Sequence, residues 1–234
     1  VVSIMTHDSS TIKDRKGCDP EPFRENITDD MTDDEKFAAA TQAALGFFEA
    51  AGYTVENGKV TAAPEGAKMS YEIIIGADGS GDHPSFAILT DAKAALESIG
   101  FTLDINDVTD SNIMWDALNA GTAEMWAAAW QATVDPDMYQ VYHSASVKSN
   151  YYHINDETLD QDIIDARSTA DQEYRKSVYK QCLDIILDWA VEIPIYQRQN
   201  CVIYSPERIN ADTFTKDVTT FYSWYNDITN IEMN

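Results

Sequence analysis

Residues 69–75 read MSYEIII, a run rich in β-branched and aromatic side chains that predicts a buried strand. A glycine-rich stretch over 76–84 follows, and residues 85–98 then repeat apolar side chains at helical spacing. We interpret the glycine-rich stretch as a strand-to-helix turn, because its glycines at 76, 79 and 81 fit no nucleotide-binding fingerprint.

The same alternation continues toward the C-terminus. Residues 101–105 predict a second strand, and a short helix over 113–118 stops at Gly121. Residues 124–130, EMWAAAW, predict a third strand. Strand, helix, strand, helix, strand in close succession indicates an α/β fold with helices on the faces of a sheet.

The N-terminal side contributes a strand and a helix. Residues 1–5 predict a strand, and the acidic stretch over 6–36 is typical of a loop-rich region. Thr32 and Glu35 form a capping-box pattern that opens a helix ending before Gly52. The pair at 57–58, Asn-Gly, predicts a hairpin turn.

The C-terminal side is helical and then aromatic. After an aromatic-rich stretch over 134–152, two helices are expected over 157–169 and 171–190. Pro194 should end the helical run, and residues 195–204 predict a further strand. The last thirty residues are aromatic and polar without clear periodicity.

Composition disfavours several classes of function. The 234 residues carry 40 acidic and 16 basic side chains, a net charge of −24, which repels phosphate backbones and anionic lipids. We therefore expect no nucleic-acid partner. No apolar run reaches the ~20 residues that a membrane helix needs. The start, VVSIM, resembles a strand entered midway, so we expect the chain to be part of a longer one.

Reactive side chains nominate neither a cofactor nor an enzyme. Cys18, Cys182 and Cys201 form no CxxC pair, and Cys182 falls on an apolar helical stripe that indicates a core position. The four histidines show no metal-ligand spacing, and no nucleophile-elbow motif occurs. We expect no cofactor, no bound metal and no catalytic residue.

The last predicted strand carries the candidate binding surface. Period-two alternation places Trp126 and Trp130 on one face with a small residue between them, which could form an aromatic shelf for a ligand. An equally good reading makes both tryptophans core residues. Asp135 and Asp137 follow at the strand's carboxyl end, where ligand sites of α/β sheets gather.

Four stretches in the second half resemble the C-terminal region of the oligopeptide-, dipeptide- and nickel-binding proteins that serve ABC importers. In chain order they are WDALNAG at 115–121, WQATVDPD at 130–137, YHINDETLD at 152–160, and Arg175 with Tyr179 followed by EIPIY at 192–196. The resemblance extends more loosely over 39–105. It is carried by the order and spacing of these stretches.

The resemblance implies one lobe of a two-lobed periplasmic-binding-protein-like fold, with a mixed central sheet flanked by helices. Residues 1–195 would form the second lobe, and residues 196–234 would return toward an absent N-terminal lobe. The implied function is that of a non-enzymatic solute-binding component outside the cell, in the periplasm or lipid-anchored at the surface. Its partners would be a small-molecule or peptide ligand, the ABC permease membrane subunits and the N-terminal lobe.

The resemblance also implies where the ligand is bound. The expected ligand-binding residues, all from the third strand or the loop after it, are Trp126, Trp130, Gln131, Thr133, Asp135 and Asp137. Members that grip a peptide's amino terminus use an Asp three residues after the Trp, where this chain has Thr133. Peptide is the leading ligand, an oligosaccharide is the main alternative, and a hydrolase or a scaffold module are the rivals from other classes.

Overall fold

The computed structural model describes residues 2–6, 28–131, 133–146, 149–196, 201–216, 218–219 and 221–234, with residues 2–6 given as backbone only. Within this part of the chain, no helix is both long enough and apolar enough to cross a bilayer. Residues 7–27 of the loop-rich region expected over 6–36, among them Cys18, lie outside the described residues.

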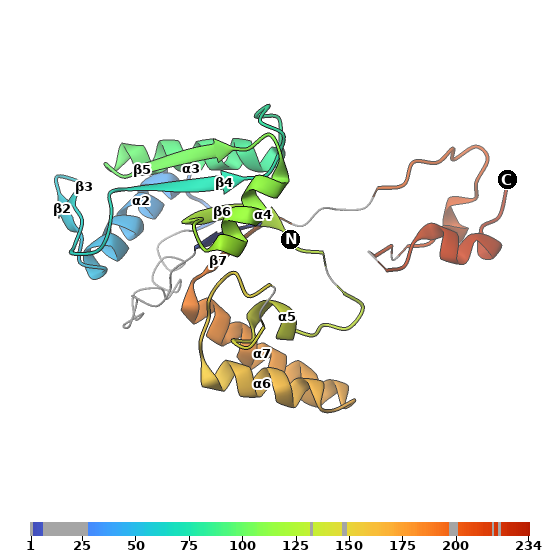
Figure 1. Cartoon of the computed structure of the whole chain (residues 1–234). Helices are drawn as coiled ribbons and strands as arrows, with labels where there is room; N and C mark the ends of the chain where they lie inside the picture. The colour runs from blue at the N-terminus through green and yellow to red at the C-terminus, as the bar shows by residue number, and fades with distance from the viewer. Residues whose placement is uncertain are drawn as a thin grey trace.

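A five-stranded mixed sheet forms the centre of the molecule, which confirms the expected α/β class (Figure 1). Its strand order is β5-β4-β6-β1-β7, in which β4 pairs in parallel with β5 and β6, and β1 pairs antiparallel with β6 and β7. The strands are β1 (Val2–Thr6), β4 (Ser70–Ile75), β5 (Thr102–Asp107), β6 (Met125–Ala129) and β7 (Glu192–Tyr196).

Alternation along the strands gives the sheet two apolar faces. Ile73 and Ile75 of β4 face α3 (Pro84–Ser98) and pack in one core with Leu89. Ile74 points to the opposite face, where it joins a larger core with Trp126 and with α4 (Ser111–Ala120). Because both faces are covered, β4 reads as a continuous apolar run.

A helical hairpin covers the second face. Helices α6 (Glu157–Arg167) and α7 (Gln172–Trp189) pack side by side below the sheet, and the short α5 (Tyr139–Tyr142) lies next to them (Figure 1). Both long helices begin at an aspartate whose carboxylate accepts backbone N–H groups of the first turn, at positions 156 and 171. Cys182 of α7 is fully buried, as its place on the apolar stripe predicts.

A smaller unit flanks the far end of the sheet. Helix α2 (Asp33–Ala50) packs on the hairpin of β2 (Thr54–Glu56) and β3 (Lys59–Ala62), and the expected capping box of Thr32 and Glu35 is present. Asn57 and Gly58 both have positive φ, 53° and 74°, as the two central residues of a type I′ turn require.

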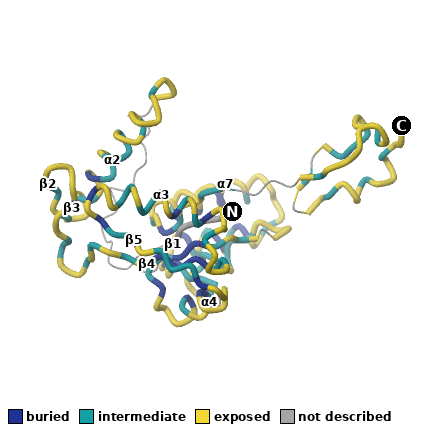
Figure 2. The backbone as a smooth tube through the Cα atoms, turned by 90° about the horizontal axis from the view of Figure 1, so that it is seen from above, coloured by how far each residue is buried: buried dark blue, intermediate teal, exposed yellow. Residues whose placement is uncertain are grey.

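The C-terminal segment, residues 201–234, extends away from the sheet (Figure 1). It contains two 3-10 helices, η1 (Ala211–Thr213) and η2 (Trp224–Asn230), and an isolated bridge between Ile209 and Met233. None of its described residues is buried, so this part of the chain has no core of its own (Figure 2).

Two expectations about the second half were wrong. The strand predicted over 195–204 is instead β7, which begins at Glu192 and contains Pro194. β7 is an edge strand, and an edge tolerates a residue that lacks an N–H. Pro194 also does not end the helical run, because α7, which matches the helix expected over 171–190, already ends at its left-handed cap Ala190, with a φ of 48°. Helix α5 was not predicted, because one helical turn is too short to show a periodicity.

Candidate functional site

Trp126 is a core residue in this structure. Only 1% of its surface is exposed, and its ring packs against Tyr152 with centroids 6.0 Å apart. The strand β6 lies inside the sheet, between β4 and β1. The face of the sheet that carries Trp126 is covered by α4 and by the chain that leads into α6. Trp126 therefore presents no open face, and the expected two-tryptophan shelf is reduced to Trp130.

Trp130 lies just after β6 and is joined to the edge strand β7 through hydrogen bonds. Its Nε1 donates to the Tyr152 hydroxyl at 2.7 Å. That hydroxyl donates in turn to Oε2 of Glu192, the first residue of β7, at 2.9 Å. Tyr142 donates to the same Oε2 at 2.7 Å, and its ring stacks on Tyr152 at 5.4 Å. We call these four residues the tyrosine network.

The electrostatics of the tyrosine network keep both phenols protonated. Burial raises the pKa of Tyr142 far above its ordinary value, and the charge of Glu192 raises it further. Burial also raises the pKa of Tyr152, with smaller contributions from Tyr142 and Glu192. Both hydroxyls therefore act as donors to one carboxylate, which is a strong, charge-assisted arrangement.

Residues 130, 131 and 133–137, here called the β6 loop, hold the remaining expected ligand-binding residues. Thr133 donates its hydroxyl hydrogen to the carbonyl of Asp135 at 2.5 Å. Asp135 pairs through Oδ1 with Nη2 of Arg175 on α7. That guanidinium lies over the ring of Tyr179, 5.6 Å from its centroid, and also donates to the Tyr179 hydroxyl at 3.4 Å.

Asp137 is fixed in a parallel way from α6. Its Oδ1 accepts the backbone N–H of Tyr139 at 3.0 Å, and its Oδ2 lies 3.2 Å from Nε of Arg167. The Arg167 guanidinium stacks over the Tyr139 ring at 4.5 Å. Each carboxylate of the β6 loop is thus paired with an arginine that rests on a tyrosine.

The candidate site residues expected from sequence make contacts with side chains that the sequence did not single out. The structure brings Trp130, Thr133, Asp135 and Asp137 together, and it leaves Gln131 exposed. The residues not predicted as part of the site are Tyr142, Tyr152, Arg167, Arg175 and Glu192. Their only sequence signals were the aromatic-rich stretch over 134–152 and the motifs around 175 and 192.

The glycine-rich turn between β4 and α3 binds a carboxylate of the protein itself, that of Asp107 at the end of β5. Asp107 accepts the N–H of Gly79 at 3.2 Å through Oδ1 and that of Gly81 at 3.0 Å through Oδ2. His83 caps α3 by accepting the N–H of Ser85. The N–H groups that a phosphate would need are occupied, which supports a strand-to-helix turn. Across the described residues, no cluster of His, Cys, Asp and Glu could hold a metal ion.

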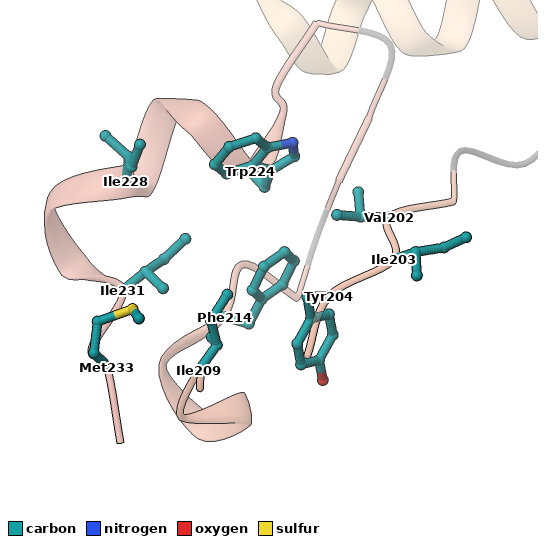
Figure 3. A pocket seen from close by; sticks show the side chains of 9 residues that line it. All are labelled: Val202, Ile203, Tyr204, Ile209, Phe214, Trp224, Ile228, Ile231 and Met233. Carbon is teal, nitrogen blue, oxygen red and sulfur yellow. The ribbon is translucent and has the colours of Figure 1, made fainter. Parts of the chain in front are cut away.

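A concave surface lies in the C-terminal segment, apart from the β6 loop. It is an apolar hollow of about 420 Å³, and Figure 3 shows the side chains around it. They are Val202, Ile203, Tyr204, Ile209, Phe214, Trp224, Ile228, Ile231 and Met233. Several are strongly exposed, Ile203 at 94% and Met233 at 70%, and the hollow offers almost no polar group to orient a solute.

Comparisons with known proteins identify the fold. No protein-family model matches the chain, and no curated protein matches it. Among solved structures, it is similar to the oligopeptide-binding protein AppA from Bacillus subtilis in complex with a nonapeptide, with 18% identity and a TM-score of 0.58. That match covers 82% of this chain and 43% of AppA.

Two further structures give the same result. NikZ from Campylobacter jejuni in complex with Ni(L-His) has 18% identity and a TM-score of 0.57, covering 82% of this chain and 43% of NikZ. OppA from Haemophilus influenzae in complex with the peptide RPPGFSPFR has 13% identity and a TM-score of 0.55, covering 83% and 42%. The expected resemblance is confirmed at the level of fold, and the chain spans less than half the length of these proteins.

Proposed function

We propose that this chain is one lobe of the solute-binding component of an ABC importer, and that it captures small solutes, with peptides as the leading class. The observation that carries this proposal is the fold, since solute-binding proteins with peptide or nickel ligands share it over more than four-fifths of the chain. The solute would be held and released without chemical conversion. Outside the cell, the closed form would then be delivered to the permease subunits.

The β6 loop is the part of this lobe that we assign to the solute. It follows the carboxyl end of a strand in the parallel half of the sheet, where α/β proteins bind ligands. Trp130, Gln131, Thr133, Asp135 and Asp137 would line the cleft, with Trp126 supporting them from the core. Closure of a second lobe over this loop would exclude water from the contacts.

An oligosaccharide is the second candidate ligand. The half-buried Trp130 supports it, because a flat aromatic ring suits the apolar face of a sugar. Nothing else in the β6 loop distinguishes a sugar hydroxyl from a peptide amide, since Gln131 can donate to or accept from either.

A thermal-shift screen of the full-length protein against short peptides, oligosaccharides and metal ions tests the proposal. A ligand at 100 times its Kd adds about 2.7 kcal/mol to the stability, which raises the Tm by a few degrees. Trp130→Ala should abolish the shift, whereas Trp115→Ala, a half-buried tryptophan on α4, should retain it. No shift with any solute, or steady turnover of one, would contradict the proposal.

The C-terminal segment fits a role as the contact to the other lobe. Its apolar hollow has no covering element among the described residues, and strands β1 and β7 lie side by side at the edge where the chain enters and leaves the sheet. We expect the other lobe to cover the hollow. Amide hydrogen exchange should be slow over 202–233 in the full-length protein and fast in residues 1–234 alone, with β4 equally protected in both.

A further inference from the structure

We propose that the β6 loop receives an uncharged part of the solute, and that Asp135 does not serve as a clamp for an ammonium group. This inference rests on the proposed solute-binding function and concerns the chemistry of that same site. It departs from what the acidity of the loop suggests, since two of its residues are aspartates.

The first reason is the pairing of Asp135. Its carboxylate binds Arg175, whose side chain is only 20% exposed and is held by the ring and the hydroxyl of Tyr179. A guanidinium fixed in this way has few other orientations, so its positive charge stays beside the carboxylate. An incoming ammonium group would meet a pair with no net charge, and its attraction to Asp135 would be offset by repulsion from Arg175.

The second reason is that Asp137 is compensated in the same way. Arg167 lies 3.2 Å from its Oδ2, and the other oxygen already accepts a backbone N–H of helix α5. The two aspartates and two arginines therefore sum to zero, and the carboxylate of Glu192, which is linked to Trp130 through Tyr152, accepts hydrogen bonds from two phenols, although the whole chain carries a net charge of −24. Charge elsewhere on the protein would act on a solute only weakly, because physiological salt screens it within roughly 8 Å.

The third reason is the chemistry of what the loop leaves open. Val134, at its tip, is 82% exposed, and Gln131 is exposed beside it. The Trp130 N–H donates to the Tyr152 hydroxyl, so it is engaged within the protein. The Thr133 hydroxyl is directed to the loop's own backbone. An isopropyl group and an amide suit a solute group with amides or hydroxyls and an apolar face.

The test measures binding of three probes to the full-length protein by calorimetry: tetra-alanine with a free α-amine, N-acetyl tetra-alanine, and cellotetraose. We expect that acetylation changes the Kd of the wild-type protein less than about threefold, and that Asp135→Asn changes the Kd of N-acetyl tetra-alanine as little, because that probe carries no ammonium group. Val134→Asp should weaken the binding of whichever neutral probe is bound by about tenfold or more, because it places an unpaired charge against that probe.

Arg175→Met provides the converse test. Removal of the guanidinium leaves the Asp135 carboxylate uncompensated, so the free-amine peptide should gain affinity relative to its acetylated form, and the gain should fall in 0.5 M salt. The Tm of each variant without ligand serves as the control for folding. Binding of cellotetraose alone also supports an uncharged solute.

Two outcomes overturn the inference, and they are distinguishable. If wild-type protein prefers the free amine by about tenfold or more, and Asp135→Asn removes that preference, Asp135 is an ammonium clamp and only this inference fails. If none of the three probes binds, the proposed solute-binding function for small peptides and sugars fails, and the inference fails with it.

Discussion

The indole N–H of Trp130 donates to the hydroxyl of Tyr152 across a distance of 2.7 Å, and the same hydroxyl donates to Glu192 on the last strand of the sheet. The end of β6 is therefore tied to the start of β7 through a single phenol. These hydrogen bonds link the residue that follows β6 to the residue at which the chain enters the edge strand β7.

Removal of that phenol should cost stability. Tyr152→Phe deletes the acceptor of the Trp130 N–H and one donor to Glu192, so the free energy of unfolding should fall by about 1–3 kcal/mol. Urea unfolding followed by tryptophan fluorescence measures it. Tyr151→Phe is the matched control, since its hydroxyl makes an exposed hydrogen bond of 3.3 Å to Asn119, and it should cost less than about 0.5 kcal/mol.

High pH should destabilise the fold because buried tyrosines, among them Tyr142 and Tyr152, resist ionisation in the folded state. The pKa of Tyr142 and of Tyr152 is raised above the ordinary 10.0, and that of Tyr53 is raised to about 12 by burial. Above pH 10 the unfolded chain loses phenolic protons that the folded chain keeps, so stability falls as pH rises, by at most about 1.4 kcal/mol per pH unit for each fully buried phenol.

Urea midpoints at pH 8, 9.5 and 11 measure this effect. The midpoint should be unaffected by these phenols below pH 10 and should drop above it. Phenolate absorbance at 295 nm should show a class of tyrosines that ionises only on unfolding. A double variant, Tyr142→Phe with Tyr152→Phe, should show a smaller drop, and an equal drop would disprove the assignment.

The core under the helical hairpin should be sensitive to cavities. Leu159 of α6 is fully buried, so Leu159→Ala should lower the free energy of unfolding by about 2–5 kcal/mol. Leu183 of α7 is 49% exposed and offers the matched control, with a loss below about 1 kcal/mol expected from Leu183→Ala. Similar losses in both variants, by chemical denaturation, would argue against this packing of the hairpin.

Two glycines should respond to alanine in opposite directions. Gly100 has a φ of 87°, and an added Cβ would lie 2.6 Å from the Val60 carbonyl oxygen, so Gly100→Ala should be strongly destabilising. Gly46 lies within α2 with nothing within 4 Å of an added Cβ. Gly46→Ala should therefore stabilise by roughly 0.5–1 kcal/mol through helix propensity. The melting temperature should fall in Gly100→Ala and rise in Gly46→Ala, and thermal unfolding of the two variants measures both changes.

Local features of the fold were predictable because they depend on neighbours in sequence. The capping box of Thr32 and Glu35, the turn at Asn57 and Gly58, and the strand β4, rich in β-branched residues, all form as their patterns indicate. The order β5-β4-β6-β1-β7 was not predictable in the same way, because it depends on which distant strands meet. Pro194 misled the prediction of β7, since edge position is a property of the whole sheet.

The candidate site shows the same contrast between features that depend on local sequence and features that depend on distant contacts. The sequence placed the candidate residues after the third predicted strand, which is β6, but the contacts of each side chain could not be predicted. Trp126 and Trp130 occupy equivalent positions in the alternation, but Trp126 lies within β6 and is buried in the core beside α4, whereas Trp130 follows the strand and is half-buried. The pairing of Asp135 with Arg175 joins residues 40 positions apart, which no local pattern reveals.

The position of β1 within the sheet has a consequence for biosynthesis. β1 comes before the other strands of its sheet in the chain, yet both of its neighbours, β6 and β7, are made more than a hundred residues later. At roughly 5–20 residues per second, β1 waits on the order of ten seconds or more before either partner exists. Throughout that time both of its edges lack their native partners, so this segment is open to pairing with other chains until β6 has been made.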